Sequence, residues 1–448
     1  MEAVVLNGPR QVSIESIDEP RLEAPTDVLL RLTSTAICGT DLHMYEGRLG
    51  DGERLVIGHE PLGVVERVGD AVVNVRVGDR VTVPTHICCG FCPNCVHGFS
   101  GACLTNNPGK WGAAYGYPGM GGYTGAQTEA LRVPFGDANC LRLPGEPGDR
   151  WEHDFVLLAD ALPTAFHATE PAQIAPGDIV VIYGAGAIGL LTTMCAFMRG
   201  ALEVFVVDAI PERLDKAGEL GARPIDMRDG DAAERILEHI ARERSGIAWR
   251  GEDANVGATV CIDAIGFQAR DPHNYSIEKP TSVIHDLARI IAPNGRLAII
   301  GVFLDSDPHA PSDPAKQGDY VIPWGTLFKK GVTVGMGRDH DKRYNDHLRD
   351  AIVSGRLTPG TIVSHRLPLR DAADAFAKFD ARSDGLHQGR ARNVTASGPC
   401  ARGSRIVKRD PSRSRLSRTI VPSERCTARF TIESPNPVPS TSPFVWPR

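Results

Sequence analysis

The stretch DIVVIYGAGAIGLLTTMCAFMRG, residues 178–200, decides the fold of this chain. An apolar run leads into a turn with Gly184, Gly186 and Gly189, spaced G-x-G-x-x-G, and an apolar helical run follows. In this pattern the first glycine makes a tight turn, the second lets backbone approach a pyrophosphate, and the third lets helix pack on strand. The helix amino terminus offers free N–H groups to phosphate. The stretch therefore predicts a dinucleotide-binding loop, and its glycines argue against reading 179–198 as a membrane span.

The region after this loop alternates predicted strands with predicted helices. Strands are expected at 203–208, 259–266 and 296–302, and a helix at 211–221. Continuous apolar strands separated by helices indicate a parallel sheet that is covered on both faces.

Asp208 ends the first strand after the loop, nineteen residues beyond Gly189. A carboxylate there can accept hydrogen bonds from the ribose hydroxyls of the cofactor and would repel a 2′-phosphate, which predicts NAD rather than NADP. The alternative is an ordinary glycine turn in an α/β domain. The predicted cofactor contacts are Gly184, Gly186, Ala187, Ile188, Gly189, Asp208 and Arg213.

The first hundred residues have a different pattern. Runs rich in β-branched residues at 28–38, 63–69 and 79–84, broken by Gly, Asp and Pro, indicate short strands of a β-barrel-type domain. Near the other end of the chain, two amphipathic helices are predicted at 342–356 and 370–381. The predicted organisation is a barrel-type domain at 1–161 and 336–389, an NAD-binding domain at 162–335, and a tail at 390–448.

Composition and charge are those of an ordinary globular protein. The 448 residues suggest two domains, and 42% hydrophobic with 23% charged residues is typical of such proteins. Residues 390–448 hold twelve Lys or Arg against three Asp or Glu, a charge of +9. Because the whole chain has a net charge of −6, residues 1–389 carry −15. That main part gives no electrostatic reason to expect nucleic acid or membrane binding. The tail is rich in Arg, Ser and Pro without sustained periodicity, so we expect it to be disordered.

Four of the eleven cysteines form the cluster CGFCPNCVHGFSGAC, as Cys89, Cys92, Cys95 and Cys103. Four thiolates this close can surround one zinc ion, and a full set of sulfur ligands predicts a structural site rather than a catalytic one. Such clustering also argues against a disulfide framework. The start of the chain, MEAVVLNGPR, lacks the segments of a signal peptide. We therefore expect a cytoplasmic protein with reduced thiols.

A second candidate metal site comes from Cys38 in ICGTDLH and His59 in GHE. A thiolate and a neutral imidazole suit zinc, and a catalytic site needs three protein ligands and an exchangeable water. Glu60 could bind the ion or orient its ligands. Taken singly, Cys38 would more often be a buried core thiol and His59 a satisfied loop histidine, and their spacing identifies no metal by itself.

The motifs CGTDLH, GHEPLGVV, GDRV, the four-cysteine cluster and YGAGAIG follow one another in the order found in the zinc-dependent medium-chain alcohol dehydrogenase family, which residues 1–389 resemble. The resemblance implies a GroES-like catalytic domain beside a Rossmann coenzyme domain, and two zinc ions per chain. It also implies that Cys38 and His59 bind the catalytic zinc, with Glu60 as the nearby acid.

One departure from that family narrows the resemblance. Many members have a cysteine as third zinc ligand, whereas LLADALPTAFHA places Asp160 there. Together with CLTNNPG, GAAYGYPGMGGYTGAQTE and VVDAIPERL, this aspartate resembles the branch of glutathione-independent formaldehyde dehydrogenases, which is related to formaldehyde dismutase. The resemblance implies Asp160 as the third ligand. The loop 104–125, with Trp111, Tyr115 and Tyr117, could shape a small substrate pocket or a subunit contact.

The activity implied is oxidation of an alcohol or hydrated aldehyde, such as formaldehyde to formate, by hydride transfer to NAD, with dismutation if NADH stays bound. Thr40 is placed to take the substrate proton and His43 to pass it towards solvent, as in the family's proton relay; turn capping is the alternative for Thr40. We expect the chain to bind a small-molecule alcohol or aldehyde and to form a homodimer or homotetramer.

Two other functions are compatible with parts of the sequence. One is a related dehydrogenase that acts on larger alcohols or polyols. The other is a zinc-ribbon protein whose basic tail binds nucleic acid, against which stand the NAD loop and the acidic main part. The tail also departs from the family, since no apolar strand follows FDARSDG. We expect a shift of reading frame near residue 386, which would leave a non-native extension.

Overall fold

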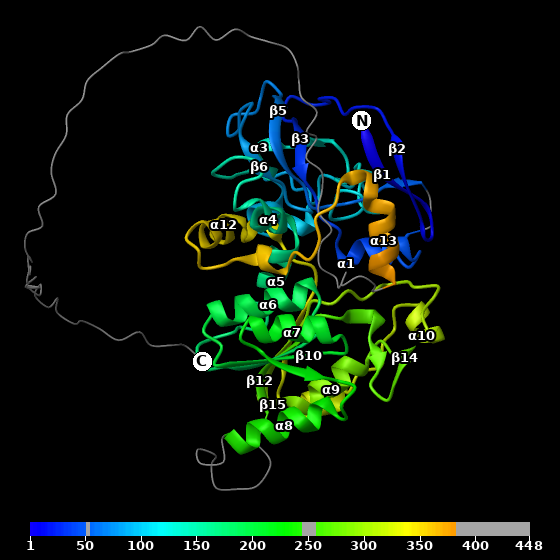
Figure 1. Cartoon of the computed structure of the whole chain (residues 1–448), viewed down its shortest axis with the longest axis vertical. Coiled ribbons are helices and arrows are strands. Elements are labelled where there is room, and N and C mark those ends of the chain that lie inside the picture. Colours follow the sequence, from blue (N-terminus) through cyan, green and yellow to red (C-terminus); the bar gives the residue numbers. More distant parts are fainter. Residues whose placement is uncertain (51–53, 244–256, 382–448) are drawn as a thin grey trace, which may run out of the picture. The chain divides into compact units, whose positions relative to one another are not determined.

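The chain folds around sheets of two kinds, antiparallel near its amino terminus and parallel in its middle. A computed structural model describes residues 1–50, 54–243 and 257–381 (Figure 1). The predicted tail at 390–448 and the expected frame shift near residue 386 lie outside the described residues. In the part of the chain that is described, no helix is long and apolar enough to cross a membrane.

Two antiparallel sheets carry the first 142 residues. The five-stranded sheet has the order β7-β3-β5-β6-β8 and the three-stranded sheet the order β2-β1-β4. Their strands are β1 (Glu2–Gly8), β2 (Gln11–Ser16), β3 (Val28–Ser34), β4 (Leu55–Val56), β5 (Leu62–Val68), β6 (Arg80–Thr82), β7 (Ala130–Val133) and β8 (Leu141–Arg142). Val28, Leu30 and Leu32 of β3 join one hydrophobic core, while Arg31 between them is exposed. This alternation is the pattern of a strand with one buried face.

The parallel sheet has the order β11-β10-β9-β12-β15-β16. The chain enters it at β9, adds β10 and β11 on one side, and then crosses over to add β12, β15 and β16 on the other side, so the strand order reverses between β9 and β12. This is the strand order of a Rossmann fold, in which ligands bind at the carboxyl ends of the strands beside that reversal. The strands are β9 (Ile179–Tyr183), β10 (Glu203–Asp208), β11 (Arg223–Asp226), β12 (Ala258–Asp263), β15 (Ile291–Ile299) and β16 (Thr333–Met336).

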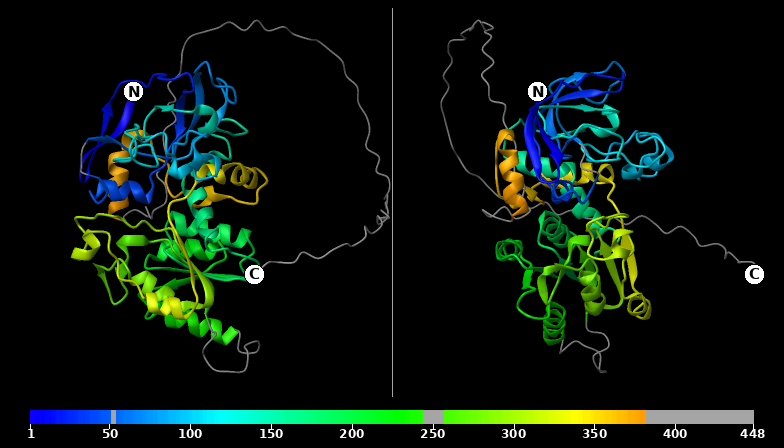
Figure 2. Two further views of the ribbon diagram at one scale, coloured as in Figure 1. Left: turned by 180° about the vertical axis from the view of Figure 1, so that it is seen from behind. Right: turned by 90° about the vertical axis from the view of Figure 1, so that its right-hand side faces the viewer.

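Helices cover both faces of the parallel sheet, as the two views of Figure 2 show. Side chains of β9 alternate between the two resulting cores, with Val180 and Ile182 in one and Val181 and Tyr183 in the other. The covering helices are α6 (Ala187–Met198), α7 (Pro211–Glu219), α8 (Ala232–Glu243) and α9 (Ser282–Ile290). The prediction of an α/β protein with a Rossmann sheet is therefore confirmed.

The chain then returns to the antiparallel sheets. The helices outside the Rossmann layers are α1 (Gly39–Tyr45), α4 (Glu152–Val156), α5 (Ala161–Thr169), α12 (Asn345–Val353) and α13 (Ala372–Asp380). Figure 1 shows α13, in orange, beside β1 and β2, and its Phe376 and Phe379 share a core with Val4 and Tyr45. The domain boundaries drawn at residues 161 and 335 stay a prediction.

Short elements complete the described chain. They are α2 (Pro93–Val96), α3 (Gly136–Asn139), α10 (Asp313–Lys316), α11 (Trp324–Lys329), β13 (Arg270–Asp271), β14 (Asn274–Glu278), and the 3-10 turns η1 (Ser100–Ala102), η2 (Leu157–Ala159), η3 (Gly266–Gln268), η4 (Asp341–Arg343), η5 (Pro359–Ile362) and η6 (Leu369–Asp371). The expected strand at 28–38 ends at Ser34, because the following residues lead into α1. The β13–β14 hairpin was not expected, because its strands are short and largely exposed.

Candidate active site

Cys38 lies directly before α1, at the helix amino terminus. Its backbone N–H donates a hydrogen bond of 2.9 Å to Oδ2 of Asp41 in the first helical turn. A carboxylate at this position caps free N–H groups, so the sequence CGTD both starts the helix and fixes the thiol. Burial raises the pKa of the Cys38 thiol. A metal ion next to Sγ would reverse that effect, because it stabilises the thiolate.

His59 lies in the loop between β4 and β5 and is fully buried. The residue before it must be glycine: Gly58 has φ +97°, and a Cβ there would lie 2.4 Å from Cγ of Gln127. The hydroxyl of Thr85 donates to the carbonyl oxygen of His59 at 2.6 Å. The G-H-E motif therefore holds the imidazole through close packing and a backbone hydrogen bond.

Asp160 is the residue before α5 and is 8% exposed. Its Oδ2 lies 3.1 Å from Nε2 of His59 and 3.9 Å from Sγ of Cys38. Its Oδ1 accepts a hydrogen bond of 2.8 Å from Thr164, one turn into the helix. Burial acts to raise the pKa of Asp160, but the neighbouring His59 lowers it to about 2. The carboxylate is therefore oriented and ionised beside the other two predicted ligands.

Together with Glu60, which is also fully buried, these three residues present ligand atoms within 4.8 Å of one another. A tetrahedral zinc ion with bonds of about 2.0–2.3 Å would set its ligands roughly 3.3–3.8 Å apart. The distances of 3.1 and 3.9 Å bracket that range. Nε2 of His59, the ring nitrogen that lies next to Asp160, is the one that would bind the metal. The residues fit zinc.

Asp41 is a site residue that the sequence analysis missed. It is fully buried, and its Oδ1 lies 3.1 Å from Nδ1 of His59, on the opposite side of the ring from Asp160. A carboxylate on the far nitrogen of a metal-binding histidine fixes its tautomer and orientation. The signal was present as the acid three residues after Cys38, but an acidic residue in the first turn of a helix is also an ordinary cap.

Thr40 and His43 lie on α1. The hydroxyl of Thr40 is 3.9 Å from Sγ of Cys38, which places it beside the predicted ligands. His43 is 8% exposed, its ring centroid lies 4.8 Å from that of Phe267, and its Nδ1 is buried without a hydrogen-bond partner. Burial, with Arg48 as the next cause, lowers the pKa of His43 to about 4. At neutral pH the imidazole of His43 is therefore neutral.

The second cysteine cluster is equally compact. Sγ of Cys89 and Sγ of Cys95 are 3.9 Å apart, and Cys92 and Cys103 lie within 4.8 Å of both. Backbone N–H groups point at three of the sulfurs, for example from Cys92 to Cys89 at 3.2 Å. A ZnS4 tetrahedron has edges of about 3.8 Å, so the cluster fits a structural zinc. All nine described cysteines are without a disulfide bond.

The glycine turn joins β9 to α6 as predicted. Gly186 is the residue before the helix, so Ala187 and Ile188 lie in the first turn. A Cβ on Gly189 would lie 1.7 Å from the carbonyl oxygen of Gly184. Only glycine therefore permits this approach of helix and strand, and the free N–H groups of α6 form a cradle that fits a pyrophosphate.

Asp208 stands at the carboxyl end of β10, beside the glycine turn. Its carboxylate accepts hydrogen bonds from the N–H groups of Ala185, Ala209 and Ile210, at 2.7 to 3.0 Å. Arg213 of α7 lies 3.6 Å from it. These contacts hold the loop in shape, a role the sequence analysis did not assign. The predicted ribose contact of Asp208 and the role of Arg213 stay predictions.

Arg48, just after α1, connects the metal ligands to the loops that follow the parallel strands. It pairs with Glu278 at 2.8 Å and with Asp307 at 2.9 Å, and its guanidinium lies 4.8 Å from the ring of Phe267. Phe267 is the residue that packs on His43. The helix that begins at Cys38 is thus fastened at its other end to the nucleotide-binding part of the chain.

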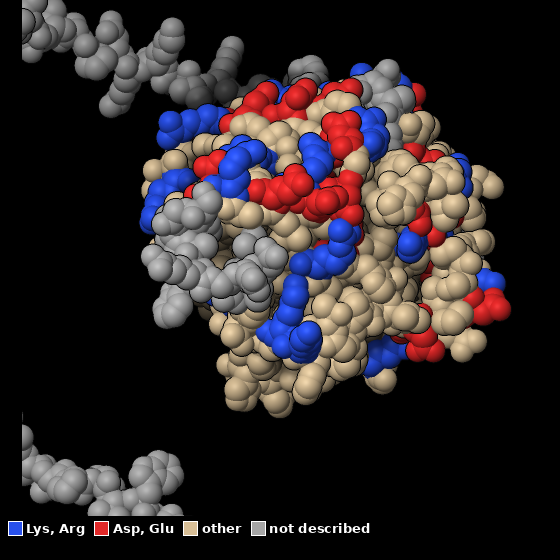
Figure 3. Space-filling model, turned by 90° about the horizontal axis from the view of Figure 1, so that it is seen from below, with Lys and Arg blue, Asp and Glu red and all other residues tan. Residues whose placement is uncertain are grey.

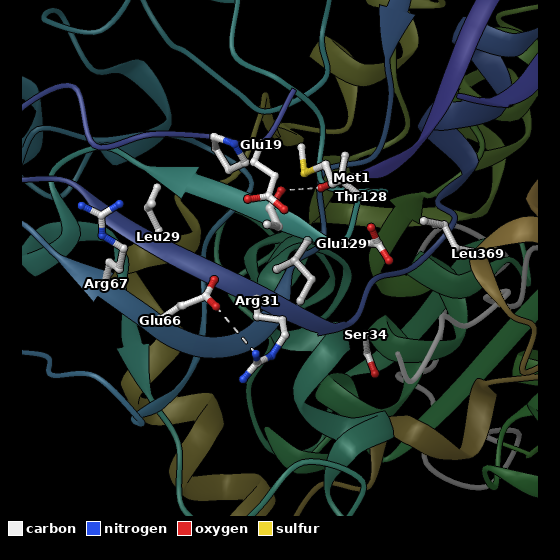
Figure 4. A pocket seen from close by; sticks show the side chains of 13 residues that line it. Met1, Glu19, Leu29, Arg31, Ser34, Glu66, Arg67, Thr128, Glu129 and Leu369 are labelled. Carbon is white, nitrogen blue, oxygen red and sulfur yellow. Dashed lines mark hydrogen bonds and ion pairs between the residues drawn. The ribbon is translucent and has the colours of Figure 1, made fainter. Parts of the chain in front are cut away.

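A groove with a volume of about 430 Å³ lies elsewhere, over the outer face of β3 and β7. Figure 4 shows its lining, where Arg31 and Glu66 form an ion pair of 3.7 Å. None of the predicted metal ligands lines it. On the face of the molecule drawn in Figure 3, acidic and basic side chains are interspersed, unlike the single-sign patch of a nucleic-acid-binding surface.

Comparison with known proteins agrees with this geometry. Residues 24–145 match the family model of the alcohol dehydrogenase GroES-like domain. The chain is 35% identical to a glutathione-independent formaldehyde dehydrogenase of Pseudomonas aeruginosa, over 84% of this chain and 94% of that protein. It is 31% identical to a formaldehyde dismutase of Pseudomonas putida, over 85% and 94%. Among solved structures it is similar to the alcohol dehydrogenase TADH from Thermus sp. ATN1, with 32% identity, a TM-score of 0.71 and coverage of 88% and 99%.

Replacing Gly189 by alanine tests the nucleotide cradle. The new Cβ would meet the carbonyl oxygen of Gly184 at 1.7 Å, so helix and strand must separate and the N–H groups move. We expect the dissociation constant for NAD to rise roughly 10- to 100-fold, measured by titration calorimetry. Gly325→Ala, where a Cβ meets open space, is the matched control. Unchanged NAD affinity in Gly189→Ala would contradict the predicted cradle.

The buried state of His43 predicts a pH dependence of stability. Its pKa is about 4 in the folded protein and about 6.5 when unfolded, so only the unfolded chain gains this proton between those values. Stability therefore rises with pH across that window, and His43 should cost about 2 kcal/mol on going from pH 7 to pH 5. Urea denaturation should show a shallower pH dependence for His43→Gln, and no such change for the exposed His273→Gln. Equal slopes for all three proteins would be inconsistent with a neutral, buried His43.

Proposed function

This chain belongs to the zinc-type alcohol dehydrogenase family, and we propose that it oxidises a small hydrated aldehyde or alcohol, formaldehyde in first place, with NAD. The family consists of oxidoreductases, and the relatives of this chain include a formaldehyde dehydrogenase at 35% identity, a formaldehyde dismutase at 31% and a probable zinc-binding alcohol dehydrogenase at 33%. The main support for the proposal is that the buried side chains of Cys38, His59 and Asp160 lie next to one another. An aspartate as third member of that set is what the formaldehyde-oxidising branch implies.

The bound groups would divide the chemistry between them: zinc at Cys38, His59 and Asp160 supplies a Lewis acid for the substrate oxygen, and NAD at the glycine turn accepts the hydride. The chain itself positions these groups and handles the proton. Thr40, beside Cys38, is proposed to accept the substrate proton at Oγ1 and to pass on its own. His43 is the proposed next acceptor, supported by its neutral state and its unpartnered Nδ1. Glu60 is a buried carboxyl group next to the ligands and is proposed to tune the metal.

The loop 104–125 supports a small substrate. Its Tyr117 packs on His59, with ring centroids 5.0 Å apart, and Tyr115 is fully buried. An aromatic ring this close to a metal ligand takes up space that a longer substrate would need. We propose that the loop shapes the substrate pocket. A preference for larger alcohols or polyols remains the competing function, and it predicts higher kcat/KM with C4–C6 alcohols than with formaldehyde.

NAD is the proposed cofactor, in preference to NADP, because Asp208 is held next to the glycine turn with its carboxylate fixed by backbone donors. A 2′-phosphate would meet that negative charge. Dismutation is proposed as a side reaction when NADH stays bound. The described cysteines, which form no disulfide, fit a reducing compartment, so the cytoplasm remains the proposed location.

A homo-oligomer is proposed from the free edge of the parallel sheet. β16 is the edge strand of that sheet, and Met336 on it is 64% exposed. Near it in sequence, Val321, Trp324 and Phe328 are 75%, 58% and 84% exposed. Exposed apolar side chains beside an open strand edge are typical of a surface that pairs with a second copy.

Cys38→Ser and Asp160→Ala test the proposed catalytic zinc. Each variant should lose one zinc equivalent per chain relative to the unmodified enzyme, because each removes one of three protein ligands. NAD-coupled oxidation of formaldehyde should fall about 1,000-fold, since the metal contributes several kcal/mol. Elemental analysis and initial rates are the measurements.

Cys195→Ser, at a buried thiol outside both clusters, is the matched control and should keep its zinc and most of its activity. Full zinc and full rate in Asp160→Ala would refute the assignment of the third ligand. A higher kcat/KM for C4–C6 alcohols with all variants behaving as expected would instead leave the zinc site intact and replace formaldehyde as substrate.

Phe328→Glu tests the proposed subunit surface. A charge at the exposed sheet edge should prevent association, so sedimentation equilibrium should give a monomer for the variant and an oligomer for the unmodified protein. Val73→Glu, at a position 82% exposed on the antiparallel part, should leave the oligomer unchanged. A monomeric unmodified protein would contradict the proposal.

A further inference from the structure

A third group of metal-ligating side chains lies outside both predicted zinc sites. It consists of His86, four residues beyond β6, and Asp339 and Asp341, which follow β16. Nδ1 of His86 lies 2.9 Å from Oδ2 of Asp341 and 3.6 Å from Oδ1 of Asp339. The sequence analysis assigned no function to these residues, because 255 residues separate His86 from Asp341.

The three side chains are shut away from water. Asp341 is 0%, Asp339 3% and His86 6% exposed. Oδ2 of Asp339 and Oδ1 of Asp341 are buried and have no hydrogen-bond partner. A buried carboxylate oxygen without a donor is costly, so these atoms indicate that a positively charged ligand belongs between them.

The surroundings supply little compensating charge. Among the described residues, the ion pairs of both carboxylates are with His86 alone. A neutral imidazole can bind a metal through a ring nitrogen, so His86 offers a third ligand atom beside the two acids.

We propose that His86, Asp339 and Asp341 bind a third divalent metal ion. The ligands would be Nδ1 of His86 and one carboxylate oxygen each of Asp339 and Asp341, since the three residues offer ligand atoms within 4.8 Å of one another. The nearest oxygens of the two acids lie 2.9 and 3.6 Å from Nδ1, close to the roughly 3.0–3.4 Å between neighbouring ligands of an ion with bonds of about 2.1 Å. One nitrogen and two oxygens, without sulfur, suit Mn²⁺ or Zn²⁺, and this distinguishes the site from the two that contain thiolates.

The position of the site indicates a structural role for the ion. Thr85, next to His86, donates its hydroxyl to the carbonyl of His59 and its N–H to the carbonyl of Ala159. An ion at His86 would join this segment to the connection between β16 and α12. It would stabilise the backbone that carries His59 and Asp160, as a positioning element and without touching the substrate.

The competing account is a carboxyl pair that shares a proton and binds no metal. Equilibrium dialysis of the zinc-loaded enzyme against Mn²⁺, followed by elemental analysis of all divalent metals, separates the two. The unmodified protein should hold about one equivalent more total metal per chain than Asp339→Asn/Asp341→Asn. The bound Mn²⁺ should lose the six-line electron paramagnetic resonance signal of the free ion.

Circular dichroism and the content of thiolate-bound zinc show whether the double variant folds. If it does not, the metal content of the single variant His86→Asn provides the test. Asp346→Asn, at a side chain 68% exposed on α12, is the matched control and should bind metal like the unmodified protein. The proposal is overturned if the unmodified enzyme holds no metal beyond its two thiolate-containing sites, or if His86→Asn and the double variant hold as much as it does.

Discussion

The structure depends on the balance of charge between one buried imidazole, that of His59, and the acidic groups around it. Asp41 and Asp160 approach the two nitrogens of His59 at 3.1 Å each, and Cys38 and Glu60 complete the surroundings. Burying charged groups costs several kcal/mol apiece unless they are paired, which supports the proposed zinc ion at their centre. Three separate segments meet there: the start of α1, the loop after β4 and the start of α5.

The rest of the fold provides the proposed site for the dinucleotide. The parallel sheet reverses its strand order between β9 and β12, which places the glycine turn at the crevice where dinucleotides bind. Arg48 holds the end of α1 against Glu278 and Asp307, and Phe267 covers His43. The same short helix therefore has the proposed metal ligand Cys38 at one end and an anchor to the loops after the parallel strands at the other. Movement between the two parts would displace Thr40 and His43 of the proposed proton relay.

Local patterns were sufficient to predict the features that are local. The glycine turn, the four-cysteine cluster and the strands at β3, β5 and β6 follow from spacing and alternation within short stretches. Asp160 required resemblance to a family branch, because nothing in LLADALPTAFHA distinguishes a ligand from a helix cap. The roles of Asp41 and Asp339 could not be predicted, since the first looks like an ordinary cap and the second meets His86 only through the fold. The contact of Arg48 with Asp307, 259 residues away, is of the same kind.

Anomalous diffraction at the zinc absorption edge, from crystals of the NAD-bound enzyme, tests the central claim most directly. The account predicts an anomalous peak within bonding distance of Sγ of Cys38, Nε2 of His59 and a carboxylate oxygen of Asp160, at about 2.0–2.3 Å from each. Crystals of enzyme that oxidises formaldehyde, with a peak at the four cysteines and no metal between those three side chains, would contradict it.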